Sequence, residues 1–164
     1  MRTYLLAAAL LLAGWCGAAS AQARPEREAI VPQGMEWAPN ILHFSPGLRS
    51  GDLLFISGVG VGLRPGETEA DKERAIDRAF QAIGRTLAAA GASWDDVVQI
   101  TSYHTDFTAG APPNAQQELF RRVKDRYVHA PYPAWTTVGV TRLWTEGLFA
   151  EISVVARIPS RRAR

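Results

Sequence analysis

An apolar stripe between positions 76 and 87 most constrains what this chain can fold into. Five apolar side chains recur there at the spacing of one helix face: Ile76, Ala79, Phe80, Ile83 and Leu87. The stripe predicts a helix whose apolar face must be covered by another structural layer. Thr68 and Asp71 provide a cap before this helix, and Gly91 provides a stop after it.

The segments around this helix have the composition of strands, so we expect the second layer to be a sheet. Strands are predicted at 53–57, 97–103, 135–143 and 148–158, with an edge strand at 27–31. A second helix is predicted from near Asn114 to a point before Pro131. The turn residues 145–147 favour a hairpin between the last two strands. The order is β-β-α-β-α-β-β, which is typical of an α+β fold with two helices on one face of a mixed sheet.

The other face of that sheet needs a cover if it is apolar. We expect five side chains to point to it: Val138, Val140, Ile152, Val154 and Ala156. A large exposed apolar patch on a soluble protein marks an interaction surface. The pattern therefore predicts a homo-oligomer.

The two ends of the chain are expected to lie outside the folded domain. Residues 1–21 have the basic start, apolar run and small residues of a signal peptide, with cleavage after Ala21 or Ala23. The apolar run is about 13 residues, whereas a spanning helix needs roughly 20, so no stable membrane insertion is expected after cleavage. Residues 22–43 are predicted to be an extended segment and 159–164 a basic tail. We expect a periplasmic or secreted protein.

Composition excludes several classes of function. With 18 basic and 16 acidic residues, the net charge of +2 does not predict a nucleic-acid partner. Cys16 is the single cysteine, and the three histidines are not spaced as metal ligands, so no metal site is expected. Glycines at 58, 60 and 62 alternate with apolar residues but lack the lysine and helix start of a phosphate loop. They indicate a strand that another part of the chain approaches closely.

Glu151 is the residue most suggestive of chemistry. It lies in the run 148–155, which is otherwise nearly devoid of charge. The carboxylate either lies exposed on the outer face of a strand or lies in a cleft, where it could act as a general acid or base. Periodicity leaves both alternatives open.

Four segments in this order and spacing carry a resemblance to a known family. They are GDLLFISG at 51–58, GASWDDVV at 91–98, PAWTTV at 133–138 and EI at 151–152. Together they resemble the RidA/YjgF family of reactive-intermediate deaminases over residues 44–158. The resemblance implies a chorismate mutase-like fold and a homotrimer with three clefts at the subunit interfaces. It also implies a small-molecule ligand and no cofactor, because characterised members hydrolyse small imines and enamines to a carbonyl product and ammonia without one.

The resemblance also implies which residues line the cleft. Glu151 matches the family's carboxylate that positions the attacking water. Gly58 matches the glycine whose backbone lines the cleft, with Ser57 beside it. Phe44 stands where active deaminases commonly have a tyrosine, so the wall is kept but the hydroxyl is not.

The sequence departs from the family at Trp135, where the deaminases' motif reads P-A-R and its arginine holds the substrate carboxylate. An indole offers one donor and a broad apolar face, so it cannot hold a carboxylate in that way. Thr137 occupies a position that is often cysteine. The chain therefore resembles a subfamily that lacks the arginine, and a cationic side chain elsewhere in the cleft, such as Arg142, would favour catalysis.

Three functions remain open from the sequence. The first is hydrolysis of small imines, enamines or related C–N bonds, with Glu151 positioning water. The second is non-catalytic binding of a small apolar or aromatic ligand in the same cleft, through Trp135 and Phe44. The third is nucleic-acid binding, described for some family members. It is supported here only by arginines at the C-terminal end, and we expect no nucleic-acid partner.

Overall fold

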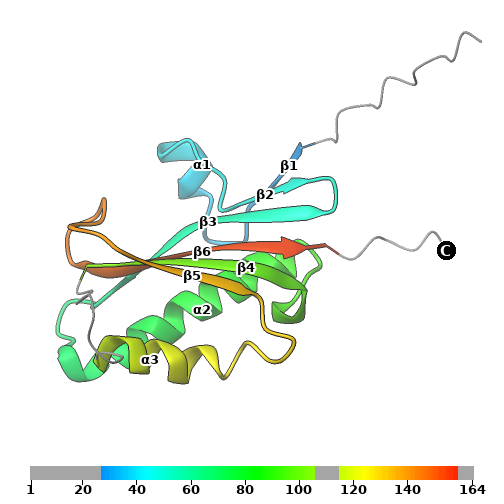
Figure 1. The fold of residues 1–164 in the computed structure, drawn as a ribbon. Helices are drawn as coiled ribbons and strands as arrows, with labels where there is room; N and C mark the ends of the chain where they lie inside the picture. Colours follow the sequence, from blue (N-terminus) through cyan, green and yellow to red (C-terminus); the bar gives the residue numbers. More distant parts are fainter. Residues whose placement is uncertain (1–26, 106–114, 159–164) are drawn as a thin grey trace, which may run out of the picture.

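The computed structural model describes residues 27–105 and 115–158 as two layers, a six-stranded sheet with two long helices on one face (Figure 1). The strands are β1 (Arg27–Ile30), β2 (Gly47–Ser50), β3 (Leu53–Gly62), β4 (Val97–His104), β5 (Ala134–Gly139) and β6 (Leu148–Arg157). The helices are α1 (Trp37–Ile41), α2 (Lys72–Ala89) and α3 (Ala115–Lys124). The predicted α+β architecture is confirmed. The expected signal peptide at 1–21, the tail at 159–164 and Asn114 lie outside the described residues.

The predicted helix stripe forms the centre of the core. All five of its side chains are at most 3% exposed: Ile76, Ala79, Phe80, Ile83 and Leu87. The predicted cap is also present, since a carboxylate oxygen of Asp71 accepts a hydrogen bond from the backbone N–H of Thr68 at 2.8 Å. It closes a short 3₁₀ turn, Glu69–Asp71, that leads into α2. None of the helices in the described part of the chain is long and apolar enough to cross a membrane.

The expected hairpin between the last two strands is wrong. The sheet order is β1-β2-β3-β6-β4-β5, so β6 lies between β3 and β4 and does not pair with β5. Strand β5 instead pairs in parallel with β4, with Ile100 opposite Trp135, and α3 makes the crossover between them. Turn residues report only that the chain reverses near 145–147. They do not report which strand the returning chain pairs with.

The expected apolar free face was also assigned to the wrong residues of β6. Ile152, Val154 and Ala156 are at most 2% exposed and lie in the core beneath the helices. The alternate set, which includes Glu151 and Val155, points to the helix-free face because successive strand residues point to opposite sides. Burying an unpaired carboxylate under the helices would cost several kcal/mol. That cost explains why the set that contains Glu151 faces away from them.

The N-terminal part of the domain contains more structure than the sequence indicated. Within the segment 22–43, expected to be extended, β1 forms the predicted edge strand but Trp37–Ile41 forms a short helix. Strand β2 pairs with the first four residues of β3 through a turn at Gly51, which has a φ of +65°. A positive φ is readily adopted by glycine, which explains its place in this tight turn.

Candidate functional site

A bulge in β3 places Ser57 and Gly58 beside the middle of β6. Ile56 pairs with Val154 and Val59 pairs with Ile152, so two residues of β3 lie opposite one residue of β6. This is the arrangement of a β-bulge, which re-aims side chains and often lies near functional sites. The bulge belongs to the first of the four segments that carry the family resemblance.

Glu151 lies directly against Gly58. A Cβ atom built on Gly58 would lie 2.6 Å from Glu151 Cδ and would overlap its carboxylate. A larger residue at position 58 would thus displace the Glu151 carboxylate, which agrees with the close approach that the sequence indicated for this strand, although the approaching group is a side chain. The structure brings these two predicted site residues together.

The surroundings of Glu151 match neither alternative in full, because the residue points to the outer face of its strand without being fully exposed. The side chain is half-buried on the helix-free face, between Gly60 of β3 and Tyr103 of β4. Leu148 fills the space beside Gly60. None of the ion pairs formed among the described residues includes Glu151. The carboxylate therefore lies in a partly enclosed place and is available to a ligand.

Ser57 lies in the middle of β3 and has a structural task beside the segment that carries Phe44. Its hydroxyl donates to the carbonyl of Ser45 at 2.8 Å, and its backbone N–H donates to the carbonyl of Pro46 at 3.0 Å. These bonds hold the segment that carries Phe44 against the bulge. Phe44 is 37% exposed, and its ring packs edge-to-face on Trp37, with the centroids 6.0 Å apart.

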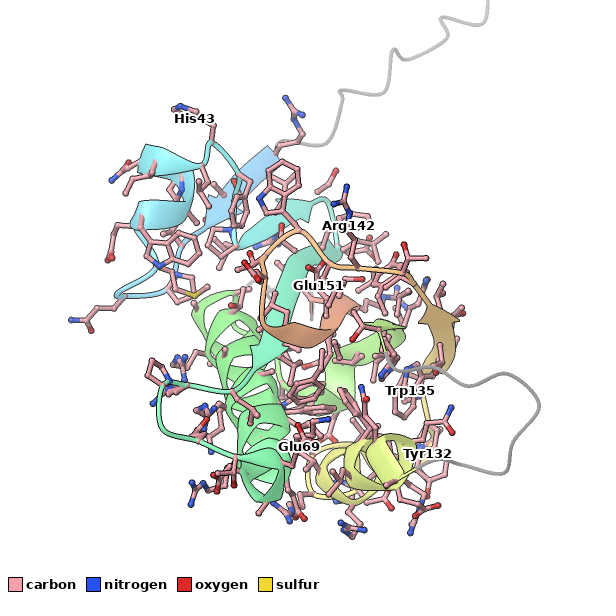
Figure 2. The ribbon with its side chains drawn as sticks, turned by 90° about the vertical axis from the view of Figure 1, so that its left-hand side faces the viewer. His43, Glu69, Tyr132, Trp135, Arg142 and Glu151 are labelled. Carbon is pink, nitrogen blue, oxygen red and sulfur yellow. The ribbon has the colours of Figure 1, made fainter. Side chains whose placement is uncertain are left out.

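Trp135 and Thr137 lie on the opposite face of the sheet from Glu151. In the parallel ladder Trp135 is paired with Ile100 and Thr137 with Ser102, and both of these β4 residues are buried on the helix side. Figure 2 shows Trp135 beside α3, together with Tyr132, whereas Glu151 lies further toward β3. One chain alone therefore does not gather all six expected site residues into a single cleft.

A cavity of about 330 Å³ lies between α3 and the strands β4 and β5. Its walls include His104, Phe120, Trp135 and Thr137, and Glu118 and Arg121 also contribute to the lining. Trp135 and Thr137 were predicted as site residues from the sequence, whereas His104 and the α3 residues were not. The cavity is thus a second candidate half-site.

A buried polar network lies behind this cavity. The Trp135 indole N–H donates to the Ser102 hydroxyl at 2.9 Å, and His104 Nε2 lies 3.0 Å from the same oxygen. The Gln116 amide nitrogen lies 3.2 Å from both His104 Nδ1 and the carbonyl oxygen of Phe149. Ser102 and His104 are polar residues at alternate positions of a buried strand, and that pattern is the sequence signal that could have found the network.

The network fixes the protonation of His104. The Phe149 carbonyl can only accept, so the Gln116 amide donates to it and to Nδ1. The ring proton then lies on Nε2 and is donated to Ser102. Burial lowers the pKa of the His104 imidazole below its ordinary value, which keeps the ring neutral near pH 7.

A larger cavity, of about 520 Å³, lies between the end of β3 and α2, and Arg78 is one of the residues that line it. Arg78 donates to both carboxylate oxygens of Glu67, at 2.7 and 2.8 Å, and to the carbonyl of Gly62 at 3.3 Å. The hydrogen bond from Arg78 is the main cause of a lowered pKa at Glu67. The arginine is thus committed to structure.

Two expectations about charged groups can be placed on the structure. Arg142, the candidate cation from the sequence, is exposed in the connection between β5 and β6 (Figure 2). Among residues 27–105 and 115–158, no group of three or more histidine, cysteine or acidic side chains could hold a metal ion.

Two comparisons of the sequence, with a family model and with known proteins, point to the same family. Residues 35–158 match the family described as endoribonuclease L-PSP, so the match begins before the expected boundary at Phe44. The chain is 40% identical to the RutC family protein YjgH of Escherichia coli (strain K12) over 134 residues, which cover 82% of this chain and 97% of that protein.

Solved structures agree with this result. A structure of protein YjgH superposes with a TM-score of 0.66 and covers 83% of this chain and 99% of its own. A probable translation initiation inhibitor from Rhodopseudomonas palustris is 29% identical, with a TM-score of 0.64 and coverage of 82% and 100%. A YjgF-family protein from Mycobacterium tuberculosis is 25% identical, with a TM-score of 0.62 and coverage of 81% and 100%. The chorismate mutase-like fold expected from the resemblance is thereby confirmed.

Proposed function

This chain belongs to the endoribonuclease L-PSP family, the family of the RidA and YjgF proteins, and from this premise we propose that it hydrolyses small imines. The substrates are imines, or enamines that tautomerise to imines, and the products are a carbonyl compound and ammonia. The observation that carries the proposal is the placement of the Glu151 carboxylate against Gly58 in a half-buried position.

Glu151 acts as the general base. It takes a proton from water as the water oxygen attacks the C=N carbon, which forms a carbinolamine. That proton is passed to the nitrogen, which completes a neutral carbinolamine. Glu151 then takes the proton of the carbinolamine hydroxyl and passes it to the amino nitrogen, so that the C=O bond forms as the C–N bond breaks and ammonia leaves. Its freedom from ion pairs among the described residues supports this role, because no cation there competes with water for the carboxylate oxygens.

We propose further that the working unit is a homotrimer. Glu151 and Gly58 lie on the helix-free face, and Trp135 and Thr137 lie on the helix side of an edge strand. A cleft that contains all of them requires a second copy of the chain, which supports the trimer that the family resemblance implies. One subunit would supply the carboxylate and its neighbour would supply the indole.

A second candidate is non-catalytic binding of a small apolar or aromatic ligand. The observation that favours it is the replacement of the family's arginine by Trp135, whose ring borders a cavity with apolar walls. Ser57 adds to this case, because its hydroxyl already donates to Ser45. In this reading Glu151 contributes only to affinity.

The substitution Glu151→Gln separates the two candidates. Imines generated in situ by an amine oxidase or an amino-acid dehydratase serve as substrates, and ammonia release above the uncatalysed rate is measured. General-base catalysis contributes about 10²- to 10⁴-fold, so a hydrolase should lose at least a hundredfold while remaining folded. Glu28→Gln, at an exposed carboxylate on β1, is the matched control. Unchanged turnover in Glu151→Gln would rule out the mechanism.

We also propose that the protein is exported and acts in the periplasm or outside the cell, on the strength of the signal-peptide pattern in residues 1–21. Cell fractionation followed by intact mass measurement tests this. The expected result is a periplasmic or secreted chain that begins after Ala21 or Ala23. A full-length chain in the cytoplasmic fraction would contradict it.

A further inference from the structure

The cavity beside Trp135 has the size of a small ligand site and aromatic walls. Its volume of about 330 Å³ falls at the lower end of the roughly 300–1,000 Å³ of typical ligand pockets. Phe120 and His104 border it from within the core, their rings packed edge-to-face with centroids 4.7 Å apart. Trp135 and Thr137 border it from β5. Such walls suit a flat apolar group.

The charges at this cavity cancel one another. Arg121 Nη2 lies 3.0 Å from a carboxylate oxygen of Glu118, and its Nη1 lies 3.3 Å from Asp125. Lys124 Nζ, which lies 5.7 Å from the centroid of the Trp135 ring, is 2.7 Å from the other carboxylate oxygen of Asp125. Both cations near Trp135 on α3 are thus paired with carboxylates. A ligand carboxylate would have to compete for them.

Trp135 is held in one orientation from behind. Ser102 is fully buried, and its oxygen receives the indole N–H. The same oxygen receives the Nε2 proton of His104, whose tautomer is set by Gln116. Two donors converge on one hydroxyl, so the indole edge is anchored and the remaining ring surface is free to form a wall. An anchored wall loses little conformational entropy when a ligand binds.

We propose that this cavity binds an uncharged, planar, apolar group of the ligand, such as an aryl ring, and that Ser102 is the residue that positions Trp135 for this contact. The inference rests on the proposed function only for the identity of the reacting group, a C=N bond conjugated to or near that ring. It answers what replaces the family's arginine: the contact with a carboxylate is exchanged for contact with a neutral ring.

A matched pair of small probes tests the charge preference. Acetophenone and phenylglyoxylate share a phenyl ketone and differ by a methyl group against a carboxylate. Their dissociation constants are measured by ligand-observed NMR titration on the wild-type protein. We expect acetophenone to bind at least tenfold more tightly, because a ligand carboxylate would lose hydration without gaining an unpaired cation. Equal or tighter binding of phenylglyoxylate, or no binding of either probe, would overturn the inference.

A double-mutant cycle tests the positioning role. Ser102→Ala should weaken acetophenone binding about tenfold, and Trp135→Phe, which keeps an aromatic ring but loses the indole N–H, should weaken it similarly. If Ser102 acts through Trp135, the two substitutions remove the same contact. The double variant should then bind acetophenone with the affinity of the single variant that binds it less tightly. If the two losses of affinity multiply in the double variant, Ser102 acts independently of Trp135, and its assignment as the positioning residue is overturned. Thr101→Ala, whose side chain points to the other face of β4, is the matched control and should bind as wild type.

Probe binding and imine hydrolysis, both measured on the same wild-type preparation, keep the two proposals apart. If acetophenone binds but no imine hydrolysis is detected, the proposed function is overturned and the proposed role of the cavity stands. Measurable hydrolysis without acetophenone binding would overturn the cavity and leave the proposed function.

Discussion

The carboxylate of Glu151 lies over the α-carbon of Gly58, across a bulge that shifts the register between β3 and β6. No side chain larger than hydrogen fits at position 58 unless the carboxylate moves. The glycine thus determines where the candidate base lies.

Gly58→Ala should therefore reduce activity more than stability. The overlap is with the end of a flexible side chain, so Glu151 can rotate away and the protein should remain folded. A displacement of about 1 Å from a productive position can cost roughly a hundredfold in rate. Activity and thermal unfolding are measured on the same preparation.

Gly60→Ala is the matched control for that experiment, because its Cβ would press on the flexible end of Leu148 instead of on Glu151. Both variants should lose similar stability, and only Gly58→Ala should lose most of its activity. Equal activities in the two variants would contradict the role given to Gly58.

His104 should make stability depend on pH below neutrality. Its pKa is lowered in the folded state by burial, whereas the unfolded chain has an ordinary histidine with a pKa of about 6.5. Between these two pKa values the unfolded chain binds a proton that the folded chain does not. The free energy of unfolding should therefore fall as pH falls below about 6.5.

Urea unfolding at pH 7.5 and pH 5 measures this dependence for the wild type and for His104→Asn. The loss of stability on acidification should be smaller in the variant. His43 and His129 are exposed and present in both proteins, so the difference isolates His104. Identical pH dependence in the two proteins would show that His104 does not contribute.

Hydrolysis of 2-aminoacrylate should be weak or absent. This substrate carries a carboxylate, and Trp135 cannot replace a forked charge-assisted contact worth about 1.5–3 kcal/mol. The expected rate is at least tenfold below that of an arginine-bearing relative, measured with a serine dehydratase that supplies the substrate. Turnover equal to that of the relative would show that another cation has taken the place of the arginine.

A chain that begins at Gln22 should sediment as a trimer at micromolar concentration. The helix-free face carries the register pair Phe55 and Val155, and Phe55 is 44% exposed on the isolated chain. Association would cover it, and each Å² of apolar surface removed from water contributes about 25 cal/mol. Sedimentation equilibrium gives the mass directly, and a monomer would contradict the proposed cleft.

Much of the fold could be predicted from local patterns. The stripe on α2 and the cap at Thr68 depend on residues three and four positions apart, and such spacing is fixed by the geometry of one helix. The chorismate mutase-like fold was predicted from the resemblance to a known family. That resemblance rests on four segments whose order and spacing extend over almost the whole domain. The same resemblance predicted Gly58 and Glu151 as site residues, and the structure places them in contact.

Tertiary structure alone decided which strands pair and which face each strand presents. Strand β6 lies between β3 and β4 and forms its ladder hydrogen bonds with these two strands, which are distant from it in the chain. The turn residues at 145–147 carry no information about which strands β6 pairs with. Alternation divided β6 into two sets, but only packing against α2 and α3 decided that Ile152 lies inside and Glu151 outside. The network that joins Trp135, Ser102 and His104 depends on the same pairing, since hydrogen bonds between strands exist only once the sheet has formed.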